Sequence, residues 1–357
     1  MKKNAVVLND YMYEMGGGER STLAYANALQ SLGYNVAIAT KNKIPCKDLI
    51  SKSFGPDFKN IRIFQYTNLE RLNESLPGKK IDLFINHSFS NYSKPIGKKS
   101  IYSVMFPGIC GRTELQNIAK YDSFFSNSNF TNKYLESRWN KMGDVLLPPI
   151  NLQRDLNTFK KEKTILNVGR FNPVGHTKNQ HLCITAFIDL KKKKSLTGWK
   201  LLLIGNINNS NLSSNYLSYC KSLIGNRNDI KILTNCSEDQ LSEAYSKSFA
   251  YLHTSGAFLP PGTFPENCEH LGLSIIEAVS YGCKPIAYYR GGIHSVFKEN
   301  YIIENYSSYS ELLNELEKLD TYFESEVTID IKTREILSDF SQTSFTERLS
   351  KLIQKSE

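Results

Sequence analysis

The fold is indicated most clearly by the stretch Pro265-Glu-Asn-Cys-Glu-His-Leu-Gly-Leu-Ser-Ile-Ile-Glu-Ala-Val-Ser-Tyr-Gly-Cys-Lys-Pro-Ile-Ala-Tyr-Tyr-Arg-Gly-Gly292. Within it, Ser274-Ile-Ile-Glu277 has the form of a capping box and predicts the start of a short helix. Gly282 is placed to end this helix in a left-handed conformation, and Pro285 prevents the helix from continuing. Residues 284–289 then predict a buried strand, so the stretch indicates one loop–helix–strand unit of an α/β protein.

Similar apolar strands alternate with helical segments along the whole chain. In the first half the predicted strands are 5–8, 35–40, 61–64, 81–86, 100–106, 121–126 and 144–147, with a helix at 19–32. In the second half they are 164–168, 200–204, 229–233, 249–253 and 284–289, with helices at 178–194, 215–226 and 237–248. Uniformly apolar strands separated by helices predict parallel sheets that are covered on both faces.

The division into domains follows from the length and from one break in the pattern. A chain of 357 residues is long enough for two domains. Pro148-Pro149 interrupts the first alternation, and the polar segment 151–163 is typical of a linker. We therefore expect domains at 1–149 and 150–343, each a Rossmann-like doubly wound sheet, facing a central cleft in which ligands bind at the carboxyl ends of the strands.

Composition limits the functional classes. The 40% apolar and 22% charged residues are typical of a globular protein, and seven dispersed cysteines without a C-x-x-C pair favour the cytoplasm and argue against a zinc site. The net charge of +9 has no nucleic-acid-binding motif beside it. Nucleic acid is therefore not an expected partner, whereas a phosphorylated substrate or peripheral contact with an anionic inner membrane surface is compatible with the charge.

Three groups of residues are candidates for binding an anionic, hydroxyl-rich ligand. Met15-Gly-Gly-Gly-Glu-Arg20 is either a flexible turn or a loop whose backbone approaches a ligand. Arg170 ends a strand and Lys178 opens a helix, so the two either grip a diphosphate or are ordinary surface charges. Glu269 and Glu277 either accept hydrogen bonds from hydroxyl groups or serve as a loop acid and a capping residue.

Together these residues resemble the retaining glycosyltransferases of family four. Glu269-His-Leu-Gly-Leu-Ser-Ile-Ile-Glu277 is similar to the E-x7-E motif of that family, and the resemblance covers nearly the whole chain. The other matching stretches are Gly16–Arg20, Asn127–Phe130, Leu147–Ile150, Val168–Phe171 with Lys178, Ser237–Ser248 and Gly291-Gly292. The resemblance implies the GT-B fold, with a C-terminal helix at 344–357 that returns to the N-terminal, acceptor-side domain and a nucleotide-sugar donor held by the C-terminal domain.

The resemblance also implies residue roles. Arg170 and Lys178 would bind the donor diphosphate, Glu269 the sugar hydroxyls and Glu277 the ribose. Further donor contacts would come from the backbone of His270, Leu271, Gly272 and Leu273 and, from the first domain, from Gly17 and Gly18. The family needs no metal or other cofactor, and the leaving phosphate oxygen accepts the acceptor's proton, so no side-chain base is expected.

The sequence departs from the family pattern at two places. Met105 stands where many relatives have a histidine, and His87 is a candidate replacement. Ser295 stands where relatives usually have a glutamate. Tyr11, Met12 and Tyr13 are candidates for the acceptor side.

The sequence thus predicts a retaining, metal-independent glycosyltransferase that moves a hexose of the mannose or glucose type to a glycan or lipid-linked acceptor. A catalytically impaired homologue that binds nucleotide or glycan is the alternative. A dinucleotide-dependent oxidoreductase fits the alternation of strands and helices but lacks the glycine fingerprint after the first strand.

Overall fold

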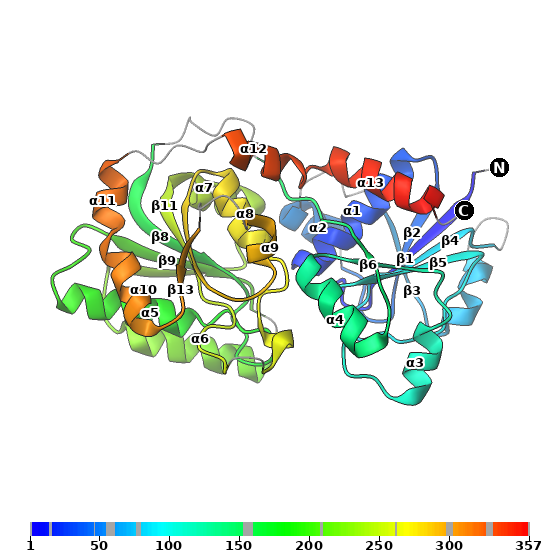
Figure 1. The fold of residues 1–357 in the computed structure, drawn as a ribbon, viewed down its shortest axis with the longest axis horizontal. Helices are drawn as coiled ribbons and strands as arrows, with labels where there is room; N and C mark the ends of the chain where they lie inside the picture. The colour runs from blue at the N-terminus through cyan, green and yellow to red at the C-terminus, as the bar shows by residue number, and fades with distance from the viewer. Residues whose placement is uncertain are drawn as a thin grey trace. The chain divides into compact units, whose positions relative to one another are not determined.

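The structure is a computed structural model that describes residues 2–13, 16–45, 47–54, 61–75, 80–152, 160–207, 210–260, 263–297, 303–325 and 331–355. The chain forms two compact units (Figure 1). The first contains Met1–Ile150 and Ser338–Glu357, and the second contains Asn151–Leu337. The chain therefore returns to the first unit before its last helix, where the backbone N–H of Ile150 donates to the carbonyl of Phe340 at 2.9 Å.

The first unit is built on a seven-stranded sheet in the order β3-β2-β1-β4-β5-β6-β7. All neighbouring strands are parallel. The strands are β1 (Asn4–Leu8), β2 (Asn35–Thr40), β3 (Arg62–Gln65), β4 (Leu83–Asn86), β5 (Lys99–Val104), β6 (Ser123–Ser126) and β7 (Asp144–Val145).

Each face of this sheet has its own apolar core. Successive side chains of a strand point to opposite faces, so Ala5 and Val7 of β1 enter one core and Val6 and Leu8 enter the other. The first core includes buried side chains of α1 (Gly17–Ser31) and α13 (Gln342–Lys355). The second includes side chains of α3 (Arg112–Ile118) and α4 (Asn129–Trp139). Helices therefore cover both faces, as the apolar strands predict.

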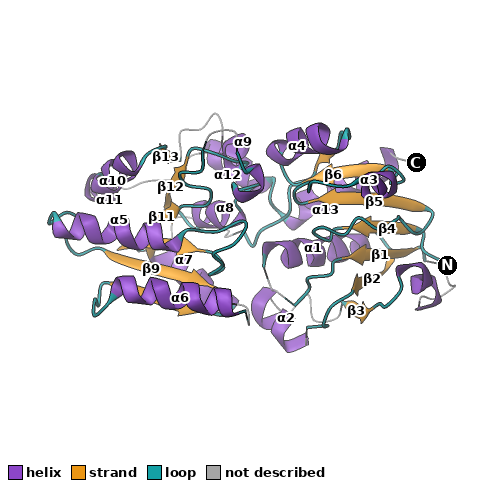
Figure 2. Ribbon diagram, turned by 90° about the horizontal axis from the view of Figure 1, so that it is seen from below, coloured by secondary structure: helices purple, strands orange, loops and turns teal. Residues whose placement is uncertain are grey.

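The second unit contains a six-stranded parallel sheet in the order β10-β9-β8-β11-β12-β13. Its strands are β8 (Glu162–Val168), β9 (Lys200–Gly205), β10 (Ile230–Thr234), β11 (Ser248–His253), β12 (Lys284–Tyr288) and β13 (Glu304–Tyr306). One face packs on α5 (Gln180–Lys192), α6 (Asn211–Ile224), α10 (Tyr309–Glu317) and α11 (Leu319–Glu324). Figure 2 shows α5 and α6 running beside β9.

The other face of this sheet is covered by α7 (Glu238–Lys247) and α8 (Leu273–Ser280). Helix α8 buries Ile275, Ile276 and Val279 against the sheet. The remaining elements are α2 (Lys47–Phe54), α9 (Ile293–Phe297), α12 (Ile331–Ser338) and short 3-10 segments at Leu69–Ser75 and Pro265–Asn267. The predicted fold class, two doubly wound parallel sheets, is confirmed.

Several local predictions differ from the structure. The strand β13 was not predicted, because its three residues Glu304–Tyr306 have no apolar run. The predicted linker ends early, since β8 already begins at Glu162, and residues 153–159 of that segment lie outside the described residues, as does Met15 of the first glycine motif. The predicted helix at 237–248 is present as α7, which opens with a capping box: the Ser237 hydroxyl accepts from the N–H of Gln240, and the Gln240 side chain accepts from the N–H of Ser237.

Across the ranges given above, none of the helices is both long enough and apolar enough to cross a membrane.

Candidate active site

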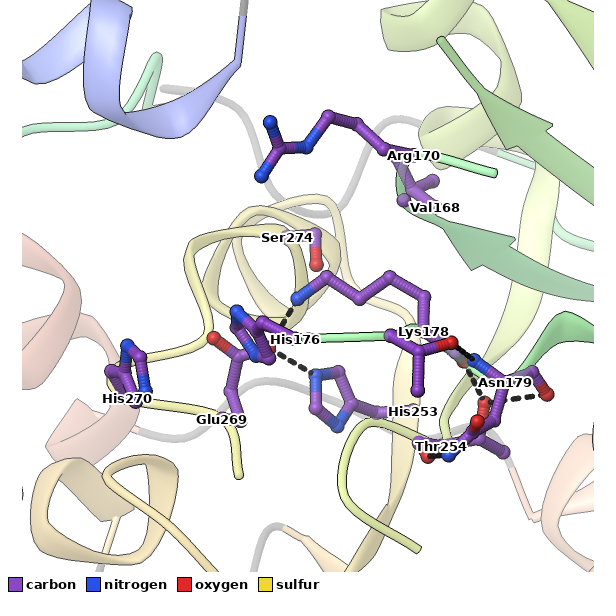
Figure 3. A network of polar contacts seen from close by, with 12 residues as sticks. Val168, Arg170, His176, Lys178, Asn179, His253, Thr254, Glu269, His270 and Ser274 are labelled. Carbon is purple, nitrogen blue, oxygen red and sulfur yellow. Dashed lines mark hydrogen bonds and ion pairs between the residues drawn. The ribbon is translucent and has the colours of Figure 1, made fainter. Parts of the chain in front are cut away.

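The carboxylate of Glu269 is the centre of a polar cluster in the second unit. Glu269 lies in the loop between β11 and α8 and is 5% exposed. Its Oε2 lies 2.5 Å from Nζ of Lys178 and 2.9 Å from Nε2 of His253. Nε2 of His176 is 3.4 Å from the same oxygen. Figure 3 shows these three side chains around Glu269, His176 and Lys178 from the segment before α5 and His253 from the end of β11.

Glu269 is ionised at neutral pH despite its burial. Burial by itself raises the pKa of this carboxyl, because it removes water from the charged form. The ammonium of Lys178 and the nearby imidazoles of His176 and His253 outweigh that effect and hold the pKa of Glu269 well below its usual range. The loop therefore presents a fixed negative charge.

Lys178 is positioned by its backbone and by the packing of its stem. Its carbonyl accepts a hydrogen bond from the hydroxyl of Thr254 at 2.5 Å. Its side-chain stem passes over Gly169, where a Cβ would overlap the methylene groups of the lysine. Gln180 of α5 donates to the carbonyls of Gly169 and Arg170, at 2.8 and 3.1 Å. These contacts tie the end of β8 to the start of α5 and direct the ammonium toward Glu269.

Arg170 follows β8 and is exposed. Its side chain runs in the same direction as that of Lys178 (Figure 3). The predicted pair of cations therefore shares one side of the second unit. Parallel sheets of this kind bind ligands at the carboxyl ends of their strands. Arg170 and Lys178 lie at that edge, because β8 ends and α5 begins there.

Two stacked histidines complete this cluster. The rings of His176 and His270 lie 4.9 Å apart and nearly parallel, at 23°. Nε2 of His270 donates to the carbonyl of Glu266 at 3.1 Å. Burial, together with the neighbouring His176, lowers the pKa of His270 to about 3. Burial and the charge of Lys178 lower the pKa of His176 as well. Both rings are therefore neutral near pH 7.

The start of α8 differs from the predicted capping box. Gly272 is the N-cap residue, with a left-handed φ of 89°. Ser274 is therefore inside the helix, and its hydroxyl accepts from the Tyr251 hydroxyl at 2.8 Å. Glu277 Oε2 accepts from the Tyr245 hydroxyl at 3.1 Å. The capping-box prediction was wrong because glycine, which adopts positive φ at little cost, lets the chain turn sharply into the helix at Gly272, two residues before Ser274.

The segment His270–Leu273 lies at the N-terminus of α8. Leu271 is buried, Gly272 forms the turn and Leu273 begins the helix. The first N–H groups of a helix have no acceptor within it, and the helix dipole favours an anion there. The glycine pair after β12 supports this segment, since the N–H of Gly292 donates to the carbonyl of Glu269 at 2.6 Å. Ser295, at the position where a glutamate was expected, donates its hydroxyl to the Gly292 carbonyl at 2.6 Å.

Several of the candidate residues belong to the first unit. Gly17 and Gly18 open α1, and the N–H of Gly16 donates to the Glu19 carboxylate at 2.6 Å. The side chain of Met105 lies against Gly18, because a Cβ at Gly18 would be 3.1 Å from the methionine sulfur. Met12 is fully buried in the core, so it is not available to an acceptor, whereas Tyr13 is 42% exposed.

His87 lies in the interior of the first unit and is 3% exposed. Its Nδ1 is 2.8 Å from the Ser103 hydroxyl, which is also 2.8 Å from the Tyr25 hydroxyl. The His87 ring packs against Tyr25 with centroids 5.2 Å apart. Burial lowers the pKa of His87 to about 4. In this position the imidazole is a neutral, packed side chain.

A His87→Gln variant is expected to flatten the pH dependence of stability. Folded wild-type protein keeps His87 neutral down to about pH 4, whereas the unfolded chain takes up the proton near pH 6.5. The unfolded state therefore binds more protons in this window, and falling pH costs about 1.4 kcal/mol per pH unit from this residue at most. Urea unfolding at pH 6.5, 5.5 and 4.5 measures the slope. Equal slopes in both proteins would contradict the assigned pKa of His87.

No group of three or more His, Cys, Asp or Glu side chains in the described part of the chain has an arrangement that could hold a metal ion. The cluster at Glu269 combines one carboxylate with an ammonium and neutral imidazoles. Such a set suits a ligand that offers both hydroxyl groups and negative charge.

Comparison with known proteins identifies the family. A family model described as glycosyl transferases group 1 matches residues 150–335, which is more than half of the 357 residues. The chain belongs to this family. It is therefore a glycosyltransferase that takes its sugar from a nucleotide-sugar donor, and the resemblance inferred from the sequence is confirmed.

Solved structures show that this glycosyltransferase has the GT-B fold. Anabaena HepE, in complex with UDP and glucose, is 15% identical with a TM-score of 0.71, covering 99% of both chains. Sucrose-phosphate synthase from Thermosynechococcus elongatus is 15% identical with a TM-score of 0.70, again over 99% of both chains. Trehalose-6-phosphate synthase, studied for glycosyl transfer with retention, is 11% identical with a TM-score of 0.70 over 99% of both. No curated protein matches the sequence significantly.

Sequence reasoning missed His176, His253, Tyr245 and Tyr251 of the glycosyltransferase. A signal was available for His253, which is the last residue of β11, at the edge where parallel sheets bind ligands. His176 could also have been found, because it lies two residues before Lys178 in a polar loop. The tyrosines gave no signal, because an aromatic residue in an apolar strand or helix usually indicates core packing.

Proposed function

We propose that this glycosyltransferase is a retaining, metal-independent enzyme that moves a hexose of the mannose or glucose type to a glycan or lipid-linked acceptor. The observation that supports the proposal best is the Glu269 carboxylate, which is ionised, 5% exposed and held by Lys178 and His253. A fixed carboxylate can accept hydrogen bonds from sugar hydroxyls while the adjacent cations neutralise a diphosphate.

The proposed roles follow from charge and position. Lys178 and Arg170 stabilise the negative charge that develops on the leaving diphosphate, and the N–H groups at the start of α8 contribute to the same effect. Glu277 accepts from the ribose hydroxyls, with its second partner, Tyr245, fixing the carboxylate. Gly17 and Gly18 contribute backbone contacts to the phosphate. Because these groups stabilise the leaving group without a metal, transfer is expected to be unchanged by EDTA.

A donor screen by thermal shift tests the proposal. One nucleoside diphosphate is expected to raise the melting temperature, and its hexose ester is expected to raise it further, since the sugar adds contacts to Glu269. A ligand at one hundred times its dissociation constant stabilises the folded state by about 2.7 kcal/mol. If no nucleoside diphosphate or nucleotide sugar shifted the melting temperature, the proposed donor site would be wrong.

The alternative is a catalytically impaired homologue that binds nucleotide or glycan. Met105 favours this alternative, because its thioether is at most a weak acceptor where many relatives place a histidine, and it lies against Gly18. The two functions are separated by single-turnover assays with the donor found in the screen. Tight binding without transfer or donor hydrolysis over a long incubation would favour the binding module.

A further inference from the structure

Three nitrogen atoms converge on one oxygen of Glu269. Lys178 Nζ at 2.5 Å and His253 Nε2 at 2.9 Å form hydrogen bonds with Oε2. A carboxylate oxygen offers about two lone-pair directions, so these two donors fill it. His176 Nε2 stays at 3.4 Å and, among the described residues, this buried nitrogen has no hydrogen-bond partner.

The second carboxylate oxygen of Glu269, Oε1, differs from Oε2 in its contacts. Within the described ranges, each contact of the Glu269 carboxylate is made by Oε2. Oε1 is therefore the oxygen that remains to accept from a donor sugar. Its direction depends on how firmly Oε2 is held, because rotation of the carboxylate about its last bond would move both oxygens together.

A bound diphosphate would compete with Glu269 for the Lys178 ammonium. A diphosphate carries more negative charge than one carboxylate, so it draws the Lys178 ammonium toward itself. As the ammonium moves away, the buried and ionised Glu269 loses its closest cation. Leaving a buried charge without its partner is strongly unfavourable. His176 Nε2 lies within about half an ångström of normal hydrogen-bonding distance and needs a partner itself.

On the basis of the function proposed above, we propose that His176 is a positioning residue that replaces Lys178 on Oε2 of Glu269 when a diphosphate draws the lysine away. With His253 it then holds the carboxylate so that Oε1 faces the sugar. This shift of His176 would give a hydrogen bond to two buried atoms at once, its own Nε2 and the Oε2 of Glu269.

The surroundings of His176 support this role. The ionisable groups around it are Lys178, Glu269, His253 and His270. The stacked ring of His270 keeps the imidazole plane in place, at 4.9 Å and 23°. Lys178 lowers the pKa of His176, and Glu269 raises it. Departure of the lysine therefore raises the pKa of His176 and strengthens its donation to Glu269.

The first test needs no ligand. In a Lys178→Met variant the lysine is absent, so His176 Nε2 is expected to bond to Glu269. Imidazole ¹⁵N–¹H NMR should then show a slowly exchanging Nε2 proton for His176, which disappears when Glu269→Gln is added. His181, which contacts the Tyr216 hydroxyl on another part of the unit, is the internal control. A His176 signal identical to that of wild type would overturn the proposal.

The second test uses wild-type protein, so it does not depend on the folding of a variant. Inorganic pyrophosphate is titrated while ³¹P NMR follows binding and ¹⁵N NMR follows His176. The expected result is a rise in the pKa of His176 with the same midpoint as binding. Bound pyrophosphate with an unchanged His176 would overturn the exchange. Failure of pyrophosphate to bind would count against the proposed donor site instead, and the Lys178→Met spectrum would still decide the exchange.

Turnover distinguishes positioning from a structural role. His176→Ala is expected to lower kcat about tenfold with little change in the melting temperature. His176→Gln keeps an N–H donor and should recover part of the loss, while the matched control His181→Gln should keep wild-type turnover. Equal turnover of His176→Ala and wild type, or equal loss in the alanine and glutamine variants, would contradict the positioning role.

Discussion

A Glu269→Gln variant is expected to lose about a hundredfold to a thousandfold in kcat/KM while keeping its fold. Removal of one preorganised polar contact in an active site commonly costs this much. Glutamine has nearly the same shape, but it removes the negative charge that Lys178 and His253 contact at 2.5 and 2.9 Å. The measurement is kcat/KM with the donor found by thermal shift, together with the melting temperature of each protein.

Glu243→Gln is the matched control for this variant. Glu243 is an exposed acid on α7 that pairs with Lys247 at 2.5 Å, so it also loses a lysine contact on mutation. Exposed pairs of this kind contribute little to stability, and turnover of the control should equal that of wild type. If Glu269→Gln retained wild-type turnover, the proposed role of Glu269 would be wrong.

A Gly292→Ala variant is expected to lose both stability and transfer. The added Cβ would overlap the carbonyl oxygen of His270. The N–H of Gly292 also donates to the carbonyl of Glu269, so the glycine sets the path of the loop that presents the carboxylate. Overpacking of this kind typically costs about 1–3 kcal/mol. Urea unfolding measures the loss of stability, and donor turnover measures the displacement of Glu269.

Gly111→Ala separates this effect from a general cost of replacing glycine. Gly111 has an ordinary φ of −77°, and a Cβ there would meet its nearest atom at 3.7 Å. This control should lose less stability than Gly292→Ala and should keep wild-type turnover, because the added Cβ meets no atom closer than 3.7 Å. Wild-type stability and turnover in Gly292→Ala would show that the loop can move without affecting the site.

Much of the fold was predictable because strand burial leaves a direct trace in the sequence. Residues 5–8 of β1, 201–204 of β9 and 285–288 of β12 are apolar throughout, since both faces of a parallel sheet are covered. Where an element lacks such a run, prediction failed. The strand β13 has only the residues Glu304–Tyr306 and is recognised only by its pairing with β12.

Part of the candidate site was also predictable from position. Arg170 and Lys178 follow a strand and precede a helix, and Glu269 and Glu277 flank a helix start, so the strand-end rule places all four on one edge of the second sheet. The capping box at Ser274 was not reliable, because the local pattern is the same whether Glu277 caps the helix or accepts from Tyr245. Only the left-handed Gly272 distinguishes the two.

The alternation of strands and helices, the family and the four charged candidate residues could be read from the sequence, because each depends on local periodicity or on a short motif. Tertiary structure alone decided which groups share one carboxylate oxygen. His176 and Lys178 come from the segment between β8 and α5, and His253 is the last residue of β11. They meet at Glu269 because β8, β11 and α8 pack together. Such a convergence leaves no periodic trace in the chain, since distances between side chains are set by the sheet and not by their separation in sequence.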